Sequence, residues 1–154
     1  MNRPKMIIAV LAFAIVAATV LTTSGAGRNS ERRAINPPGA AAGLPFSNGV
    51  MVGNMLFVSG QEGLVDGKVV TGGIGPETQT SLENIKRVVE LGGFQMTDVV
   101  TVNVYLADIG DFAEMNKVYK TIFPEPRPAR TTVQVAALVN NARVEISAIA
   151  VKQH

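Results

Sequence analysis

The chain of 154 residues contains no cysteine and a single histidine, His154, which is the last residue. The absence of cysteine excludes disulfides, thiolate nucleophiles, iron–sulfur clusters and cysteine-ligated zinc. Because chain ends are usually mobile, His154 is expected to be a solvated tail residue, whereas a catalytic base needs a fixed position. Histidine-based triads and histidine-rich metal sites are therefore excluded. The length suits one domain with its own core.

The chain has no excess of positive or negative charge once the N-terminal segment is set aside. The formal net charge is +2, but two of the 14 basic residues, Arg3 and Lys5, lie in the first 26 residues, which contain no acidic residue. The remainder therefore carries equal numbers of basic and acidic residues, and the basic ones are scattered. Nucleic-acid-binding modules usually cluster basic residues on one face, so no nucleic-acid partner is expected.

The N-terminal segment has the parts of a secretory signal peptide. Residues 1–5 carry two positive charges, residues 6–21 are apolar or small, and Ser24 and Ala26 are small residues where signal peptidase reads the chain. We therefore predict a signal peptide over 1–26, cleavage after Ala26 and a periplasmic or secreted protein. The alternative is an uncleaved N-terminal membrane anchor, although the run is shorter than the roughly 20 apolar residues of a spanning helix.

Residues 27–40 lack an apolar period and contain two prolines, which predicts an extended leader before a domain over 41–154. Within the domain, residues 49–61 predict a β-hairpin around a Gly-Asn turn. The dipeptide Asp66-Gly67 suits a second tight turn.

Two helices are expected from apolar residues that recur every three or four positions. The first begins at Gly75-Pro76-Glu77, where proline and an acid favour a helix start, and ends at Gly92-Gly93. The second carries its apolar stripe over 112–122, and Asp111 with Glu114 resembles a capping box at its start.

Three further strands complete the predicted domain. Residues 98–106 alternate valines with polar residues, so Val100, Val102 and Val104 are expected on one buried face. Two last strands are predicted over 131–138 and 143–152, joined through an Asn-Asn turn.

The resulting order, β-β-α-β-α-β-β with largely antiparallel strands, predicts a two-layer α+β domain whose helices pack on one face of a sheet. The other face is either solvated or buried against other subunits. The 47% apolar composition favours burial, although part of that fraction belongs to the signal peptide.

Candidate chemical groups lie on the last two strands. Arg130 and Thr132 share a face of one strand, and Glu145 and Ser147 share a face of the other, because side chains alternate along a strand. Arg130 and Glu145 could thus lie at the rim of a buried layer, where a guanidinium can bind a carboxylate through two hydrogen bonds. Spacing alone equally fits ordinary exposed residues on a half-solvated sheet.

Two other places are less specific. Ser59-Gly60-Gln61 at a strand end is either a hydroxyl and backbone close to a ligand or simply a turn. Asn116 on the second helix is either a hydrogen-bonding group of a pocket or a surface amide.

Taken together, several segments resemble the RidA (YjgF-like) family in order and spacing over about residues 35–152. The segments are Leu44-Pro45-Phe46-Ser47, Val58-Ser59-Gly60-Gln61, the helix 79–85, the helix 111–119, Pro128-Ala129-Arg130-Thr131-Thr132-Val133 and the strand 144–151.

The resemblance implies a chorismate-mutase-like α+β fold and a homotrimer with active sites in the clefts between subunits. The implied reaction is hydrolysis of 2-aminoacrylate or 2-iminopropanoate, and of 2-iminobutanoate, to 2-keto acids and ammonia, with no metal or organic cofactor. Arg130 matches the family arginine that binds the substrate carboxylate. Glu145 matches the glutamate that positions and deprotonates water.

The resemblance also assigns substrate-binding positions, and the chain departs from the family pattern at some of them. The matching residues are Phe46, Ser59, Gly60, Asn116 and Thr132. Phe46 stands where many members carry tyrosine, Thr132 where cysteine is common, and Ser147 where another acid is common, so substrate preference or rate is expected to differ.

The alternative function is a non-catalytic, chaperone-like exported trimer that binds small carboxylates or proteins without turnover. Some members of the family that the chain resembles are reported as ribonucleases. The near-neutral charge of this chain argues against that activity. Contact with a membrane is expected only if the N-terminal segment stays uncleaved.

Overall fold

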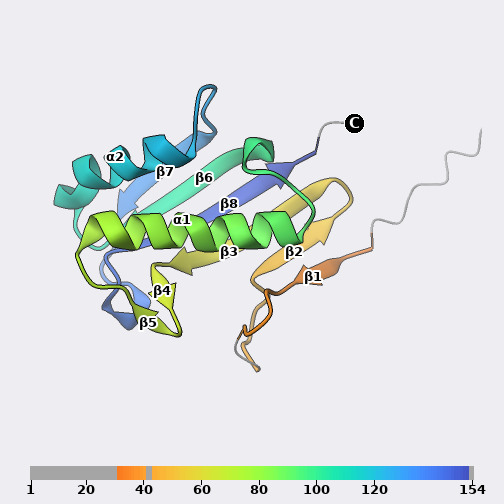
Figure 1. Cartoon of the computed structure of the whole chain (residues 1–154), viewed down its shortest axis with the longest axis horizontal. Coiled ribbons are helices and arrows are strands. Elements are labelled where there is room, and N and C mark those ends of the chain that lie inside the picture. The colour runs from red at the N-terminus through yellow and green to blue at the C-terminus, as the bar shows by residue number, and fades with distance from the viewer. Residues whose placement is uncertain (1–30, 41–42, 153–154) are drawn as a thin grey trace, which may run out of the picture.

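The computed structural model of the chain describes residues 31–40 and 43–152 (Figure 1). The predicted signal peptide with its cleavage site, and His154, lie outside these residues. In the two described ranges, no helix is long and apolar enough to cross a membrane.

The centre of the molecule is a six-stranded sheet with the strand order β1-β2-β3-β8-β6-β7. Neighbouring strands run antiparallel except β6 and β7, which are parallel. The strands are β1 (Arg33–Ile35), β2 (Gly49–Val52), β3 (Met55–Glu62), β8 (Val144–Val151), β6 (Val99–Leu106) and β7 (Ala129–Gln134). The pair β4 (Leu64–Val65) and β5 (Lys68–Val69) forms a small separate sheet.

Two helices, α1 (Ile74–Leu91) and α2 (Phe112–Ile122), cover one face of the sheet (Figure 1). Their apolar stripes meet alternate residues of the central strands, so that Leu82, Ile85 and Met115 are fully buried together with Val104 and Ile146. Short 3-10 helices lie at Met96–Asp98, Ile109–Asp111 and Val139–Asn141. The prediction of a two-layer α+β domain with both helices on one face is confirmed.

The predicted turns are also confirmed. Gly53 opens the β2–β3 turn with a φ of 59°, and Asp66 and Gly67 join β4 to β5 with φ values of 51° and 74°. Left-handed backbone of this kind favours glycine, asparagine and aspartate. Asn140 and Asn141 adopt it as well, between β7 and β8.

Several expected details were wrong. Val100 is 47% exposed and Val99 is 5% exposed, because an irregularity in the β6–β8 pairing between Val99 and Thr101 changes which residue faces the core. Asp111 precedes α2 but makes no side-chain cap, since its carboxylate binds Arg143 instead.

The element boundaries also differ from those predicted. The segment 33–35 of the predicted leader forms the edge strand β1 and buries Ile35. The strand expected over 131–138 is β7, which begins two residues earlier and ends at Gln134. The first helix begins at Ile74, just before the expected start.

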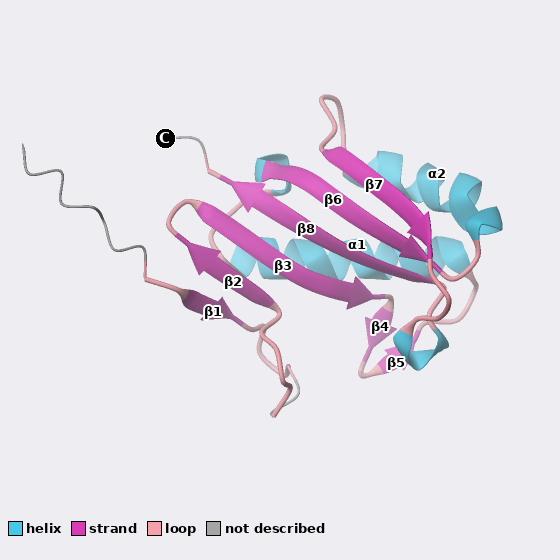
Figure 2. Cartoon of the chain, turned by 180° about the vertical axis from the view of Figure 1, so that it is seen from behind, coloured by secondary structure: helices cyan, strands magenta, loops and turns pink. Residues whose placement is uncertain are grey.

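No helix of the described residues lies on the second face of the sheet, as Figure 2 shows from behind. Along β8, Val144, Ile146, Ala148 and Ala150 are buried under the helices, and the residues between them are partly exposed on this open face. Phe57 on β3 and Val133 on β7 are 41% and 40% exposed. The open face is therefore apolar in part.

Candidate active site

Arg130 lies on β7 and points to the helix side of the sheet. Its backbone pairs with Val102 of β6, a fully buried core residue, and paired residues of neighbouring strands share a face. The guanidinium carbon lies 4.4 Å from the centre of the Tyr119 ring and 5.7 Å from that of Phe112, both on α2. Cation–π contact with these rings therefore orients the guanidinium.

A hollow of about 280 Å³ opens beside this guanidinium. We call it the guanidinium hollow. It is lined by Asn116, Tyr119, Lys120, Arg127, Pro128 and Arg130. The structure thus brings Asn116 of α2 together with Arg130 of β7.

Two buried hydroxyl groups near Arg130 have no hydrogen-bond partner among the described residues. One is the Tyr119 hydroxyl, on a residue only 2% exposed, and the other is the Thr132 hydroxyl, two positions along β7 on the same face. Burial raises the pKa of Tyr119, and the nearby positive charges of Arg130 and Arg127 act in the opposite direction. A buried hydroxyl without a partner costs free energy, so a partner from outside the described residues would stabilise either group.

Glu145 lies on β8 and points to the open face, opposite to Arg130. It pairs with Tyr105 of β6, which stands three residues from Val102, the partner of Arg130. Because side chains alternate along β6, Tyr105 and Val102 lie on opposite faces. Within one chain, the sheet therefore separates the carboxylate of Glu145 from the guanidinium of Arg130.

A second hollow, of about 350 Å³, lies over Glu145. We call it the carboxylate hollow; it is lined by Gly60, Tyr105, Glu145 and Ser147 of the sheet and by Val135, Ala137 and Leu138 of the β7–β8 connection. Its wall contains both polar and apolar side chains.

Gly60 leaves the space that the Glu145 carboxylate occupies. The β3–β8 pairing is irregular between Val58 and Gln61, so Ser59 and Gly60 bulge out of the ladder. A Cβ atom at position 60 would collide with the Glu145 carboxylate. The glycine therefore lets this side chain lie across β3.

Ser59 and Phe46 lie beside the bulge. The Ser59 hydroxyl donates to the Ser47 carbonyl at 2.7 Å, and its N–H donates to the Asn48 carbonyl at 2.9 Å. These bonds anchor the segment that follows Phe46, whose side chain is 53% exposed. The Ser59 hydroxyl is thus committed to the backbone of its own chain as a donor, with its oxygen still able to accept.

Glu62 is a polar neighbour of Glu145 that the sequence did not single out. The two residues are paired across β3 and β8. Asn140 Nδ2 donates to Glu62 Oε2 at 2.7 Å, while Oε1 is buried and has no partner among the described residues. Burial raises the pKa of Glu62, the Asn140 hydrogen bond lowers it, and the charges of Glu145 and Glu77 raise it further.

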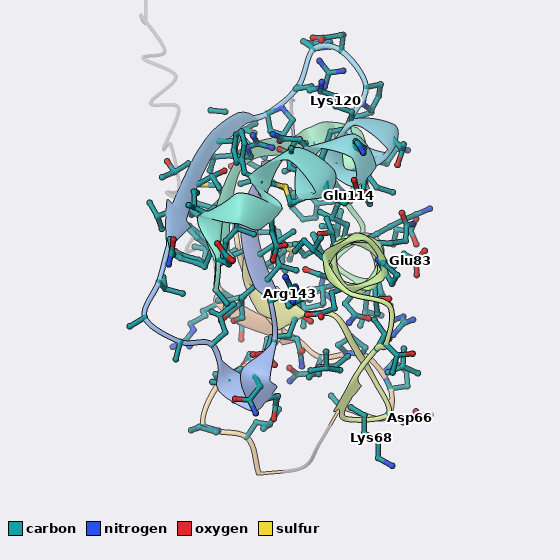
Figure 3. All side chains as sticks on the ribbon, turned by 90° about the vertical axis from the view of Figure 1, so that its left-hand side faces the viewer. Asp66, Lys68, Glu83, Glu114, Lys120 and Arg143 are labelled. Atoms are coloured by element: carbon teal, nitrogen blue, oxygen red, sulfur yellow. The ribbon has the colours of Figure 1, made fainter. Side chains whose placement is uncertain are left out.

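Two further polar contacts hold the frame of the site. The Arg143 guanidinium binds the Asp111 carboxylate through hydrogen bonds of 3.0 and 2.9 Å, which joins the start of α2 to the start of β8 and raises the pKa of Arg143. The Arg143 N–H donates to Glu77 Oε2 at 2.7 Å, and Glu77 is buried in the first turn of α1. In the view of Figure 3, Arg143 lies near the centre of the projection, and its side chain is 46% exposed.

The predicted residues thus form two groups. Arg130, Asn116 and Thr132 belong to the helix side of β7, while Glu145, Gly60 and Ser59 belong to β3 and β8. Tyr105, Glu62 and the β7–β8 connection were missed. Strand alternation could have placed Glu62 beside Gly60, but only pairing between distant strands brings it to Glu145.

The two-layer α+β domain with this sheet belongs to a known fold class. The endoribonuclease L-PSP family model matches residues 35–152. The chain belongs to this family, which is the RidA (YjgF-like) family identified from the sequence motifs.

The relatives include enzymes and solved structures. The chain is 45% identical over 125 residues to the 2-iminobutanoate/2-iminopropanoate deaminase of Dermatophagoides farinae, covering 79% of this chain and 98% of the relative. It superposes on the E. coli YjgF gene product with a TM-score of 0.73 and 35% identity, covering 79% and 99% of the two chains. For E. coli TdcF with bound serine, the TM-score is 0.72 at 36% identity, with the same coverage. These neighbours confirm the predicted fold class.

Proposed function

We propose that this protein hydrolyses small 2-imino acids and their enamine tautomers, such as 2-iminopropanoate and 2-iminobutanoate, to 2-keto acids and ammonia. Relatives that are 40 to 45% identical bear the name 2-iminobutanoate/2-iminopropanoate deaminase. The observation that carries the proposal is the Arg130 guanidinium, fixed on two aromatic rings with no described carboxylate within ion-pair distance. A guanidinium fixed in this way suits a small planar carboxylate.

The chemistry follows from the charge of the two groups. Arg130 binds the substrate carboxylate, and Glu145 accepts a proton from water as the water oxygen bonds to the imine carbon. This proton passes to the imine nitrogen, which gives a carbinolamine. A second proton, from the new hydroxyl group, then moves to the nitrogen, the carbon–nitrogen bond breaks, and ammonia leaves with the electron pair while the keto group forms. Ser59, Asn116 and Thr132 supply polar contacts to the substrate, Gly60 gives room for Glu145, and Phe46 forms an apolar wall.

The complete site is proposed to form between subunits of a homotrimer. Arg130 and Glu145 lie on opposite faces of one sheet, so one chain cannot place both beside one small substrate. A ring of three copies can place the guanidinium hollow of one chain against the carboxylate hollow of the next. The same contact would cover apolar residues of the open face, including Phe57 and Val133.

The activity is tested by measuring ammonia release from enzymatically generated 2-iminopropanoate and 2-iminobutanoate. Arg130→Ala and Glu145→Ala are each expected to lower kcat/KM at least about 100-fold, because each removes a group that acts on the reacting molecule. Lys86→Ala, on the exposed side of α1, is the control and should retain the activity. A folded wild-type trimer that does not accelerate either reaction contradicts the proposal.

Export is proposed from the N-terminal pattern alone. A charged start, an apolar run and small residues before Gly27 favour cleavage after Ala26 in the periplasmic or secretory route. The intact mass of the protein from an exporting host should match a chain that begins at Gly27. A mass that retains residues 1–26, with the protein in the membrane fraction, would support the anchor instead.

A further inference from the structure

The guanidinium hollow carries more positive charge than one substrate carboxylate requires. Three of its six lining residues, Lys120, Arg127 and Arg130, are basic, and none is acidic. Lys120 lies one helical turn after Asn116, so both are on the same side of α2. Figure 3 shows Lys120 near the loop that leads into β7.

Only part of this charge is compensated within the described chain. Arg127 pairs with Glu125, and its Nε donates to the Phe123 carbonyl at 3.1 Å, which holds its stem against the end of α2. Lys120 and Arg130 have no described carboxylate within 4.0 Å. Three cations and one paired acid leave the hollow with excess positive charge.

The Tyr119 hydroxyl gives an independent reason to expect a polar ligand here. The residue is 2% exposed, lines the hollow and has no hydrogen-bond partner for its hydroxyl among the described residues. The charges of both Arg130 and Arg127 act on this hydroxyl. An anionic acceptor drawn between the two guanidinium groups would give it the missing partner.

We propose that the guanidinium hollow selects 2-imino acids that carry a second carboxylate on the side chain, such as the imines of four- and five-carbon amino dicarboxylates. The inference rests on the proposed function and names its substrate class. Arg130 binds the carboxylate next to the imine carbon, and Lys120 with Arg127 binds the distal one. The hydrolysis is unchanged: water adds to the imine carbon, and ammonia leaves.

Kinetics with matched substrates tests the assignment on the full chain. Wild-type protein is expected to show a kcat/KM for 2-iminoglutarate at least about tenfold above that for 2-iminobutanoate. Lys120→Gln and Arg127→Gln are each expected to reduce this ratio about tenfold, the effect of losing one charge-assisted contact. Lys117→Gln is the matched control, because Lys117 pairs with Glu114 at 2.6 Å and does not line the hollow.

Calorimetry with the two keto acid products separates charge selection from turnover. 2-Oxoglutarate should bind more tightly than 2-oxobutanoate, and Lys120→Gln should remove most of the difference.

If 2-iminobutanoate is hydrolysed without a preference for the dicarboxylate, the inference is overturned and the deaminase function stands. If neither imine is hydrolysed but 2-oxoglutarate binds in a Lys120-dependent manner, the selection is supported and the deaminase function is rejected. Equal binding of both keto acids overturns the inference.

Discussion

At the scale of single residues, Gly60 decides where the Glu145 carboxylate can lie. A methyl group at this position would occupy the space of the carboxylate, which is the end of a flexible side chain. We therefore expect Gly60→Ala to move the carboxylate at a cost below about 1 kcal/mol in stability, while kcat/KM falls about tenfold or more, because a misplaced base acts poorly.

Gly75→Ala is the matched control for this substitution. A Cβ atom at Gly75 would meet only Glu114 Oε1, at 3.9 Å, and Gly75 lies in the first turn of α1. Thermal unfolding should give similar stabilities for the two variants. Deamination kinetics should show a much lower kcat/KM for Gly60→Ala than for Gly75→Ala. Full activity of Gly60→Ala would contradict the assigned role of Glu145.

Glu62 predicts a pH-dependent contribution to stability. Its pKa is raised in the folded protein, chiefly by burial. Between the unfolded pKa, about 4.3 for glutamate, and the raised folded pKa, the folded state holds more protons, so stability falls as pH rises through this window. Glu62→Gln removes this loss, because glutamine stays neutral and can keep an acceptor for Asn140.

Chemical denaturation of both proteins at several pH values checks this expectation. The stability of Glu62→Gln relative to wild type should be greater at pH 7 than at pH 4, where Glu62 is mostly protonated in both states. Glu83→Gln, on the exposed side of α1, controls for the general loss of one negative charge. A difference that does not change with pH would show that Glu62 titrates alike in both states.

At the scale of elements, the contact between Arg143 and Asp111 joins α2 to β8. Because the pair is bidentate and Arg143 remains partly exposed, Asp111→Asn should lower the free energy of unfolding by about 1 kcal/mol, as a half-solvated charge-assisted pair would. Denaturant titration at low and high salt tests this. A loss that is independent of salt would indicate that packing, and not the ion pair, holds α2 in place.

The elements themselves were largely predictable, and their pairing was not. The helical stripes around Leu82 and Met115 and the Asp66-Gly67 turn follow from local pattern and turn chemistry. The exposed Val100 was not predictable, because the irregularity depends on how β6 meets β8. The prediction of Asp111 as a helix cap was wrong. Its actual partner, Arg143, is 32 residues away in the sequence, so the local pattern does not reveal this contact.

The geometry of the candidate site, too, was predictable only where it depends on local sequence patterns. Alternation within each strand gave the faces of Arg130 and Glu145 relative to their own neighbours. Whether these two faces coincide depends on the register of β7 with β6 and of β6 with β8, which no local pattern encodes. The bulge that brings Gly60 to Glu145 likewise arises only from pairing.

At the scale of the whole molecule, the central claim is that one site takes Arg130 from one chain and Glu145 from another. Three features agree with this arrangement: the open sheet face, the absence of a described carboxylate partner for Arg130, and the separation of the two hollows. In the proposed trimer, each single variant, Arg130→Ala or Glu145→Ala, would inactivate every site. A mixed trimer, however, contains some sites with both intact residues.

The most direct test is to unfold Arg130→Ala and Glu145→Ala chains together in equal amounts, refold them and measure ammonia release from 2-iminobutanoate. Random assembly predicts recovery of about a quarter of the wild-type activity, because each residue of a shared site has an even chance of being intact. Wild-type protein taken through the same refolding is the reference, and mass spectrometry should verify mixed trimers. Mixed trimers without any recovered activity would contradict a site shared between chains.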